Sequence, residues 1–315
     1  MTNNEIVYRE KLPACPKKLT DRIITIDNVD YLMERPPGGN KGGNSWIFYL
    51  YDLGQNEIEE GEELPEIPDL VMKVNRFPLN DWHSIAIARN NRFEQEIDAL
   101  FACKGKSFII DIFHKGVIID SDSNKYQFYT MEYAEYDLKS YMECKDSLTK
   151  NQRLSICIKL AQALESLNSM DYYHRDIKPD NFFLTTKNEW KIGDLGLVAK
   201  RNIPNEIDKE QEYIGPKGWT SPEVMNKVLT IEQNTKFDRI IDDKSDIFQL
   251  GLVLWYVMQG NAPIGCIMET DFLENDHSLY ILIRTMVSYP KGLRPQSFTQ
   301  IVSRLKEIAT NELIA

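Results

Sequence analysis

The sequence predicts an α+β fold of two unequal lobes, a small β-rich lobe with one main helix and a larger, mainly α-helical lobe. Two observations support this fold class. Short runs rich in β-branched and aromatic residues fill the first third of the chain, whereas most later segments repeat their apolar residues at helical intervals. We expect an N-terminal extension at 1–30, the small lobe at 31–133 and the large lobe at 134–315, together forming one domain.

The small lobe begins with two predicted strands, Trp46–Tyr51 and Leu70–Val74. The acidic segment Asn56–Asp69 lies between them and is interpreted as an exposed hairpin loop, with a partner-binding loop as the alternative. A helix is expected at Ile85–Ala102. The remaining elements are two strand-like runs and three helices, at Phe108–Ile119, Tyr126–Tyr133, Leu154–Met170, Asp246–Met258 and Phe298–Ala309.

Composition narrows the class of protein. The 315 residues are 42% hydrophobic and 27% charged, as in soluble globular proteins. A net charge of -11 argues against nonspecific binding to nucleic acid or to an anionic membrane. The longest apolar run, around Leu250–Met258, is too short to span a bilayer. Five scattered cysteines without zinc-like spacing, and no apolar leader, predict buried thiols in a cytoplasmic protein.

The strongest chemical signal is the segment His174–Asn181, followed by Asp194-Leu195-Gly196 and later by Ser221-Pro222-Glu223. Any one of these strings could be an ordinary turn. Their joint occurrence in this order points to phosphoryl transfer, which needs an orienting carboxylate, metal ligands and a cation.

These residues can supply each of those parts. Asp176 can accept the proton of an attacking hydroxyl, and Lys178 can lie on the γ-phosphate of ATP. Asn181 and Asp194 have the oxygen ligands that hold magnesium. We therefore predict an ATP-dependent phosphotransferase.

With these motifs the sequence resembles the eukaryotic-type serine/threonine protein kinase family, across about Tyr31–Ala309. The resemblance implies a bilobal protein-kinase-like fold that binds ATP with Mg²⁺, or with Mn²⁺, and phosphorylates protein hydroxyls. It also implies that Lys73 holds the α- and β-phosphates and pairs with a helical glutamate. Glu96 is preferred over Glu94 for that role, because three apolar residues share its inward face, namely Phe93, Ile97 and Leu100.

The nucleotide pocket is assigned by the same resemblance. The segment Tyr129–Ala134 is similar to the hinge, which makes Met131 the gatekeeper and gives the backbones of Glu132 and Ala134 to adenine. Val71 precedes the lysine on the same strand and belongs to the pocket.

The glycine-rich loop departs from the family pattern. In the segment Asn40–Ile47, Gly42 keeps the middle glycine, whereas Asn40 and Ser45 replace the outer two. Gly43 adds backbone freedom, and Asn tolerates positive φ, so a phosphate cradle is still expected. Ile47 stands in the position of the family's valine.

Two structural pairs also follow from the resemblance. Asp246 is expected to anchor the backbone near His174, and Arg294 is expected to pair with Glu223. A buried ion pair of this kind costs about 3–5 kcal/mol when broken from one side.

The type of kinase is indicated by the catalytic loop, which is the segment His174–Asn181. Lys178, directly after Ile177, matches the serine/threonine pattern, and dual specificity stays open. Kinases of small molecules lack the segment Ser221-Pro222-Glu223, which favours a protein substrate. A pseudokinase that only binds or scaffolds is the other alternative. The degenerate glycine-rich loop and Pro216 favour it. Pro216 lacks the hydroxyl that family members offer to the catalytic Asp, which leaves Asp176 and Lys178 to rely on each other or on water.

Regulation is suggested by Arg175, since an arginine before the catalytic Asp often binds a phosphate on the activation loop. The segment Leu197–Gly215 contains no Ser or Thr, and Tyr213 is its single hydroxyl. We hypothesise that one loop carboxylate pairs permanently with Arg175, aided by Lys200 or Arg201. The candidates, which could instead be merely solvated, are Glu206, Asp208, Glu210 and Glu212.

Overall fold

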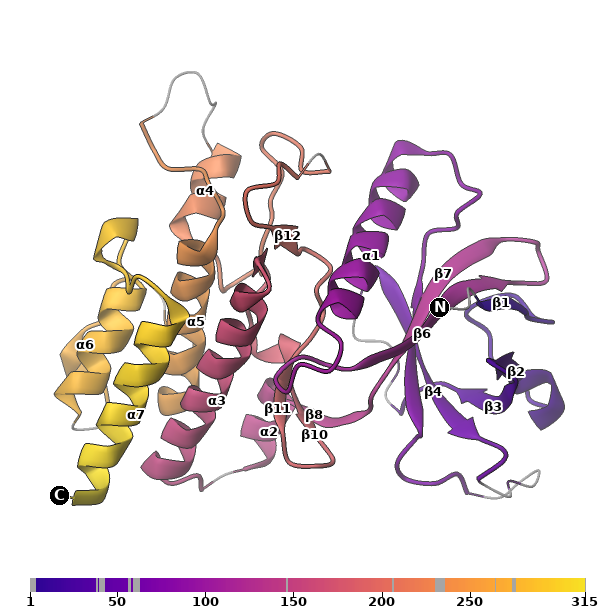
Figure 1. Ribbon diagram of the computed structural model, residues 1–315, viewed down its shortest axis with the longest axis horizontal. Helices are drawn as coiled ribbons and strands as arrows, with labels where there is room; N and C mark the ends of the chain where they lie inside the picture. Colours follow the sequence, from indigo (N-terminus) through magenta and orange to yellow (C-terminus); the bar gives the residue numbers. More distant parts are fainter. Residues whose placement is uncertain are drawn as a thin grey trace. The chain divides into compact units, whose positions relative to one another are not determined.

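The computed structural model describes residues 4–37, 39, 43–55, 58, 63–145, 147–205, 207–229, 236–263, 265–273 and 276–314 (Figure 1). The chain forms two compact units. Unit 1 comprises Met1–Lys104 and Ile110–Tyr133, and unit 2 comprises Gly105–Ile109 and Ala134–Ala315. Unit 1 is rich in strands and unit 2 in helices, which confirms the predicted α+β class.

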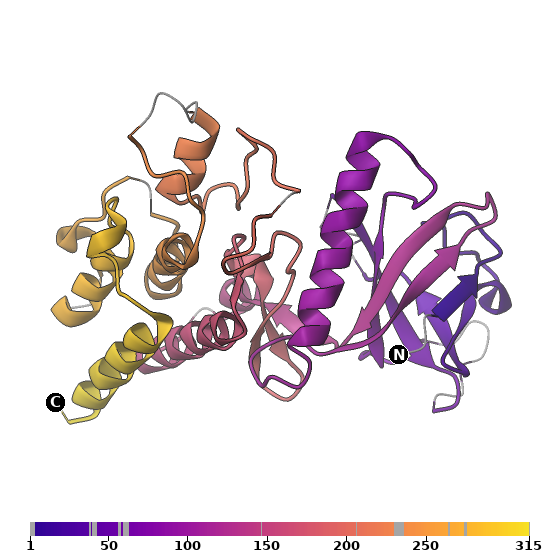
Figure 2. The same cartoon turned by 45° about the horizontal axis from the view of Figure 1, so that its top comes forward.

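Unit 1 is built on a seven-stranded sheet in the order β1-β6-β7-β5-β4-β3-β2. Its neighbours pair antiparallel except for the parallel pair β1 and β6. The strands are β1 (Asn4–Val7), β2 (Ile23–Ile26), β3 (Val29–Glu34), β4 (Ser45–Asp52), β5 (Leu70–Asn75), β6 (Ile112–Ile119) and β7 (Lys125–Met131). A 3-10 turn, η1 (Leu19–Arg22), precedes β2, and the helix α1 (Ser84–Ala102) contacts β6 and β7 (Figure 2).

The first thirty residues, expected to be an N-terminal extension, contribute strands to this sheet. They supply both edge strands, β1 and β2. Strand β1 can pair with β6 because Gly116 lies opposite Asn4; a Cβ on this glycine would lie 2.0 Å from the Asn4 carbonyl oxygen. The predicted strand from Phe108 begins at Ile112 instead, since Gly105–Ile109 packs with unit 2.

One face of the sheet is covered by the apolar core of unit 1. Alternation along each strand sends every second side chain into this core. Its buried members come from the N-terminal segment and from all the central strands: Ile6, Tyr8, Leu12, Ile24, Ile26, Tyr31, Met33, Trp46, Phe48, Leu50, Met72, Val74, Ile118, Tyr126 and Phe128. Residues of even number in β4 therefore face the core, and those of odd number face the opposite side.

Unit 2 is mainly helical, with one three-stranded sheet, one two-stranded sheet and an isolated bridge between Ile109 and Ile192. Its helices are α2 (Leu138–Cys144), α3 (Lys150–Ser169), α4 (Pro222–Leu229), α5 (Asp243–Gln259), α6 (His277–Met286) and α7 (Phe298–Ile314). Its 3-10 turns are η2 (Pro179–Asn181), η4 (Glu269–Asp271) and η5 (Lys291–Leu293). Its strands are β8 (Ala134–Asp137), β9 (Tyr172–Tyr173), β10 (Phe182–Thr185), β11 (Trp190–Ile192) and β12 (Ala199–Lys200).

Capping residues fix where the central helices begin and end. Thr149 and Gln152 form a capping box at the start of α3, and Asp242 and Ser245 form another at the start of α5. Helix α5 ends at Gly260, whose φ of 78° is the left-handed conformation that favours glycine. Twelve of the seventeen residues of α5 are buried, so this helix lies in the interior of unit 2.

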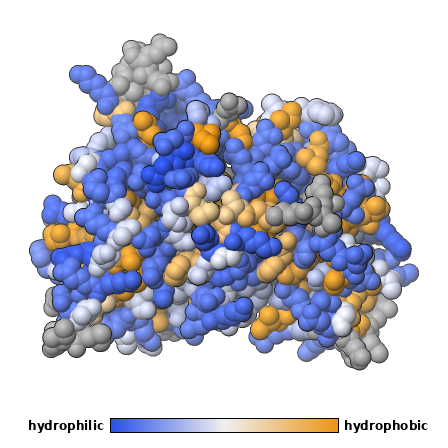
Figure 3. Space-filling view, viewed as in Figure 1, coloured by the Kyte–Doolittle hydropathy of each residue, from blue (hydrophilic) through white to orange (hydrophobic). Residues whose placement is uncertain are grey.

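The surface agrees with the composition. Hydrophilic residues predominate on the face drawn in Figure 3, and apolar residues appear there in small separate groups. No helix among the described residues is long and apolar enough to cross a membrane. All five cysteines are free thiols; the interpretation of them as buried is wrong for Cys144 and Cys266, which are exposed.

Candidate active site

The predicted site residues fall in both units, and each group has its own geometry. In unit 1, the Lys73 Nζ atom donates to Glu96 Oε1 at 2.7 Å. Glu96 is 2% exposed, whereas its rival Glu94 is exposed. The Tyr129 hydroxyl donates to the same Glu96 oxygen at 2.9 Å. The buried carboxylate is thus held by a cation and a hydroxyl, which is how a buried charge becomes tolerable.

The candidate nucleotide residues share one face of the sheet. Ile47 lies opposite Lys73, and Lys73 lies opposite Tyr129, in a row across β4, β5 and β7. Val71 and Met131 face each other in the next row. Because residues two apart on a strand point the same way, all of them lie on the face away from the core of unit 1. The structure therefore brings together Ile47, Val71, Lys73 and Met131.

Part of the predicted glycine-rich loop lies outside the described residues, because Asn40, Lys41 and Gly42 are not among them. Gly43 is exposed, and its carbonyl oxygen accepts from Arg76 Nη1 at 2.8 Å. Ser45 opens β4 and, by alternation, is on the face of Ile47.

The hinge residues have defined backbone partners. The Glu132 N–H donates to the Asp111 carbonyl oxygen at 3.0 Å, and the Asp111 N–H donates to Glu132 Oε1 at 2.8 Å. An adenine contact through Glu132 has therefore to use its carbonyl oxygen. Ala134 belongs to unit 2, where it opens β8 opposite Thr185.

In unit 2, Asp176 is held from two sides. Lys178 Nζ lies 3.4 Å from Asp176 Oδ2, and Asn181 Nδ2 donates to the same oxygen at 3.0 Å. Asn181 Nδ2 also donates to the Asp176 carbonyl oxygen at 2.7 Å. Asp176 and Lys178 are thus in contact with each other, which is the first of the two alternatives expected for them. The carboxylate keeps a fixed direction while its side chain remains partly exposed.

The side chains of Asn181 and Asp194 are of the types that fit magnesium. The Gly193 N–H donates to the Asn181 carbonyl oxygen at 3.1 Å, which ties the segment with Asp194 to the catalytic loop. Because Asn181 uses its amide nitrogen for Asp176, its amide oxygen is the group left for a cation. One carboxylate and one amide oxygen suit Mg²⁺, which takes few protein ligands when phosphates supply the others. No group of three or more His, Cys, Asp or Glu suited to a metal occurs among the described residues.

The catalytic loop is hydrogen-bonded to α5 through its backbone. Asp246 accepts the N–H of His174 at 2.7 Å and the N–H of Arg175 at 2.8 Å, which confirms the predicted anchor. Arg175 has a φ of 66° and Asp194 a φ of 53°, and such backbone strain in non-glycine residues is typical of functional loops. Burial raises the pKa of Asp246 to about 7, although both N–H groups oppose that shift.

Burial lowers the pKa of His174 and so favours its neutral form. Its Nε2 lies 3.1 Å from the Gly193 carbonyl oxygen and its Nδ1 lies 3.2 Å from the Asp176 N–H. A carbonyl oxygen can only accept, so Nε2 carries the proton and Nδ1 accepts from Asp176.

This pKa direction predicts a pH dependence of stability. The unfolded imidazole titrates near 6.5, so the neutral form stabilises the fold fully above that pH and the contribution is lost as pH falls below it. We expect the melting temperature of the wild type to fall more steeply between pH 7 and pH 5 than that of a His174→Phe variant. Thermal unfolding of both proteins across that range measures the difference; equal slopes would contradict a depressed His174 pKa.

Arg175 is fixed by the loop that follows Asp194. Its Nε donates to the Leu197 carbonyl oxygen at 2.6 Å, and its guanidinium forms an ion pair with Asp208. The side chain of Arg175 is 4% exposed and that of Asp208 is 10% exposed. The structure thus selects Asp208 among the candidates; Glu206 is outside the described residues, and Glu210 lies 3.5 Å from Arg239.

Pro216 has a different role from the threonine of the family. Its carbonyl oxygen accepts from the Tyr213 hydroxyl at 3.1 Å and from Thr220 Oγ1 at 3.0 Å. Tyr213 and Thr220 also bond to each other. The two hydroxyls of this segment are therefore engaged at its own turn.

The predicted pair of Glu223 and Arg294 is confirmed. Arg294 Nη2 donates to Glu223 Oε1 at 2.8 Å, and the two side chains are 0% and 2% exposed. Ser245 Oγ donates to the other Glu223 oxygen at 3.0 Å. This pair joins α4 and α5 to the segment before α7.

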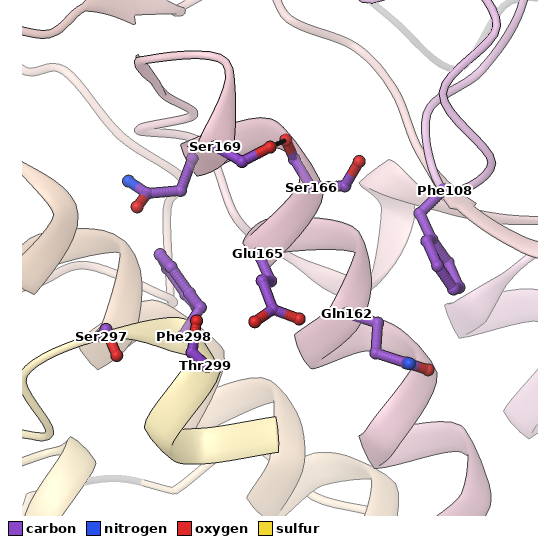
Figure 4. A pocket seen from close by; sticks show the side chains of 9 residues that line it. Phe108, Gln162, Glu165, Ser166, Ser169, Ser297, Phe298 and Thr299 are labelled. Atoms are coloured by element: carbon purple, nitrogen blue, oxygen red, sulfur yellow. Dashed lines mark hydrogen bonds between the residues drawn. The ribbon is translucent and has the colours of Figure 1, made fainter. Parts of the chain in front are cut away.

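A hollow of 470 Å³ lies between α3 and the start of α7 (Figure 4). Phe108 and Phe298 are at its two sides, and the Glu165 carboxylate points into it. None of the predicted site residues lines this hollow, so it is separate from the catalytic loop.

Sequence reasoning missed two residues that hold the site. Tyr129 bonds Glu96, and its place two residues before Met131 on the same strand face was the signal for it. Gln249 accepts the Ile177 N–H at 3.0 Å, and its position three residues after Asp246 on α5 was the corresponding signal.

Comparison with known proteins gives matches to protein kinases. A sequence model of the protein kinase domain matches residues 82–312. The chain is 30% identical over 181 residues to the membrane-associated tyrosine- and threonine-specific cdc2-inhibitory kinase wee-1.3 of Caenorhabditis briggsae, covering 53% of this chain and 25% of that protein. It is 29% identical over 188 residues to the serine/threonine-protein kinase cds1 of Schizosaccharomyces pombe, covering 58% and 37%.

A third relative is the dual specificity protein kinase TTK of Mus musculus, 23% identical over 147 residues, which are 47% of this chain and 17% of that protein. The chain thus spans well under half the length of each of these relatives.

Proposed function

Because the chain belongs to the protein kinase family, matched over residues 82–312, we propose that it is an ATP- and Mg²⁺-dependent kinase that phosphorylates serine and threonine hydroxyls of proteins. The observation that supports this best is the catalytic loop, in which Lys178 and Asn181 hold the Asp176 carboxylate. A module that only bound nucleotide would gain nothing from a carboxylate aimed in this way.

In the proposed mechanism, Asp176 accepts the proton of the substrate hydroxyl and points that oxygen at the γ-phosphorus. The bond from this oxygen to the γ-phosphorus forms as the bond to the leaving ADP oxygen breaks. Lys178 neutralises charge on the transferring group while it holds Asp176. Positioning and electrostatics supply most of the acceleration, since the protein forms no covalent bond to the substrate.

Lys73, oriented by Glu96, would bind the α- and β-phosphates. Asn181 and Asp194 would hold Mg²⁺, which when bound neutralises charge on the phosphate oxygens. Adenine would lie on the sheet face of Ile47, Val71 and Met131, with the backbones of Glu132 and Ala134 as its polar partners.

The test is to incubate the purified chain with ATP, Mg²⁺ and a generic protein substrate, then to map phosphate by mass spectrometry. Phosphoserine or phosphothreonine on substrate or chain is the expected result. Two relatives bear names that include tyrosine or dual specificity, so phosphotyrosine is scored in the same spectra. Phosphate on tyrosine alone would contradict the residue class, and no phosphate at all would contradict the activity.

The pseudokinase alternative is favoured by one observation, the replacement of a threonine hydroxyl by Pro216, whose carbonyl accepts from Tyr213 and Thr220. The effect of Mg²⁺ on the thermal stabilisation by ATP distinguishes a catalytic kinase from a pseudokinase. A catalytic site bound to ATP through Asn181 and Asp194 should gain extra thermal stability from ATP when Mg²⁺ is present.

We further propose that the kinase is active without phosphate on its activation loop, because Asp208 already supplies the anion that Arg175 binds. Replacing Asp208 by Ala should lower kcat about tenfold, since a hydrogen bond to a charged group is worth roughly 1.5–3 kcal/mol and the loop loses it. Steady-state assays of the phosphatase-treated protein measure this effect.

Glu210→Ala is the matched control. The Glu210 carboxylate belongs to the same loop, is more exposed than that of Asp208, and lies 3.5 Å from Arg239. It should keep kcat within about twofold. An unphosphorylated wild type that is inert, and that gains activity only with phosphate on Tyr213, would contradict permanent activation by Asp208.

A further inference from the structure

Gln249 is a buried polar residue in the middle of α5. Its side chain is 0% exposed, as are its helix neighbours Ile247, Leu250 and Val253. Its Oε1 atom accepts the Ile177 N–H at 3.0 Å. Ile177 directly follows Asp176, so this hydrogen bond fixes the peptide group next to the carboxylate that would accept the substrate proton.

The same carboxamide is unfavourable for packing alone. Its Nε2 atom is buried and finds no hydrogen-bond partner in the part of the chain that the structure describes. Leaving a buried donor unmatched costs more than an apolar side chain of similar size would. A residue selected only to fill the space between α5 and the catalytic loop would therefore be apolar. The polar group at this position points to a task at the Ile177 N–H.

Gln249 also lies against the end of the activation loop. A Cβ atom on Gly215 would lie 3.5 Å from Gln249 Nε2 and 3.6 Å from the Arg175 carbonyl oxygen. Gly215 has a φ of 153°, a conformation that residues with a side chain rarely adopt. The backbone at Gly215 thus lies close to the carboxamide and to the catalytic loop.

Asp246 and Gln249 act on consecutive parts of one loop. They are three residues apart on α5 and so lie on the same helix face. Asp246 accepts the N–H groups of His174 and Arg175, and Gln249 accepts that of Ile177. The Asp176 N–H is instead bound by the His174 ring. Every backbone N–H from His174 to Ile177 is therefore fixed from within unit 2.

We propose that Gln249 is a positioning residue for phosphoryl transfer: it sets the direction of Asp176 through the Ile177 peptide and couples that peptide to the activation loop at Gly215. This inference rests on the proposed kinase activity. It predicts that loss of the carboxamide oxygen lowers turnover while leaving nucleotide binding unchanged, because neither Gln249 nor Ile177 is assigned to the nucleotide.

The test compares Gln249→Met, which keeps the length of the side chain but cannot accept a hydrogen bond, with Gln249→Glu, which keeps an oxygen in the same place. Gln249→Met should lower kcat about 10- to 100-fold, the effect of a small misplacement of a reacting group, with the KM for ATP within about twofold. Gln249→Glu should recover part of kcat. Hydrogen exchange of the Ile177 amide, followed by NMR, should be faster in Gln249→Met.

Val253→Ala is the control for a merely structural effect, since Val253 is equally buried in α5 but has no hydrogen bond to the loop. It should lower the melting temperature and leave kcat per folded molecule unchanged. Gln249→Met with wild-type kcat, or with an unchanged Ile177 exchange rate, would overturn the proposal. A fall in kcat per folded molecule in Val253→Ala that accompanies its loss of stability would also overturn the proposal, because the effect on kcat would then be merely structural. A wild type no more active than Asp176→Asn would instead overturn the proposed function, and this inference with it.

Discussion

An Asp176→Asn variant is expected to lose about 1,000-fold in kcat, within the range of general acid–base contributions. Asparagine has the size of aspartate and can still accept from Lys178 and Asn181, which lie 3.4 Å and 3.0 Å from Asp176 Oδ2. It cannot take the proton of the substrate hydroxyl. The loss should therefore appear in kcat, with binding of ATP and Mg²⁺ within about twofold of the wild type.

Initial rates with a protein substrate and calorimetric ATP titrations measure the two quantities. Asp171→Asn is the matched control, because it makes the same chemical change at an exposed residue just before the catalytic loop and should keep full turnover. Equal turnover in the wild type and in Asp176→Asn would show that Asp176 is not the proton acceptor and that any phosphate transferred came from another source.

The elements of this fold are readable from sequence because local rules specify them. Helix α5 has its own start signal at Asp242 and its stop signal at Gly260, and the predicted helix from Asp246 lies inside those limits. The preference for Glu96 likewise needed only the helical repeat, which places it beside Phe93 on the buried face of α1.

Other features depend on contacts that no local rule contains. Strand β1 pairs with β6 across more than a hundred residues, and it does so through the gap that Gly116 leaves for Asn4. A four-residue strand of this kind has little periodicity to recognise. The pairing of Arg175 with Asp208 is similar, since four acids of an irregular loop were equivalent until the path of the loop was known.

The second large effect concerns stability. Replacing Glu223 by Ala is expected to lower the free energy of unfolding by about 3–5 kcal/mol, because it leaves the Arg294 guanidinium buried without its anion. Arg294 is 0% exposed on its side chain and cannot reach water without disturbing α4 and α5. Chemical denaturation followed by fluorescence measures the change.

A double-mutant cycle separates the lost pair from the lost packing. Replacing both Glu223 by Ala and Arg294 by Met should be less destabilising than the sum of the single changes, since the double variant has no unpaired buried charge. Glu307→Ala is the control on an exposed pair, as Glu307 lies 2.6 Å from Arg304 with its side chain 56% exposed. It should cost less than about 1 kcal/mol. Additive effects in the cycle would mean that Arg294 finds water or another anion when Glu223 is removed, and that the pair is not what joins α4 to the segment before α7.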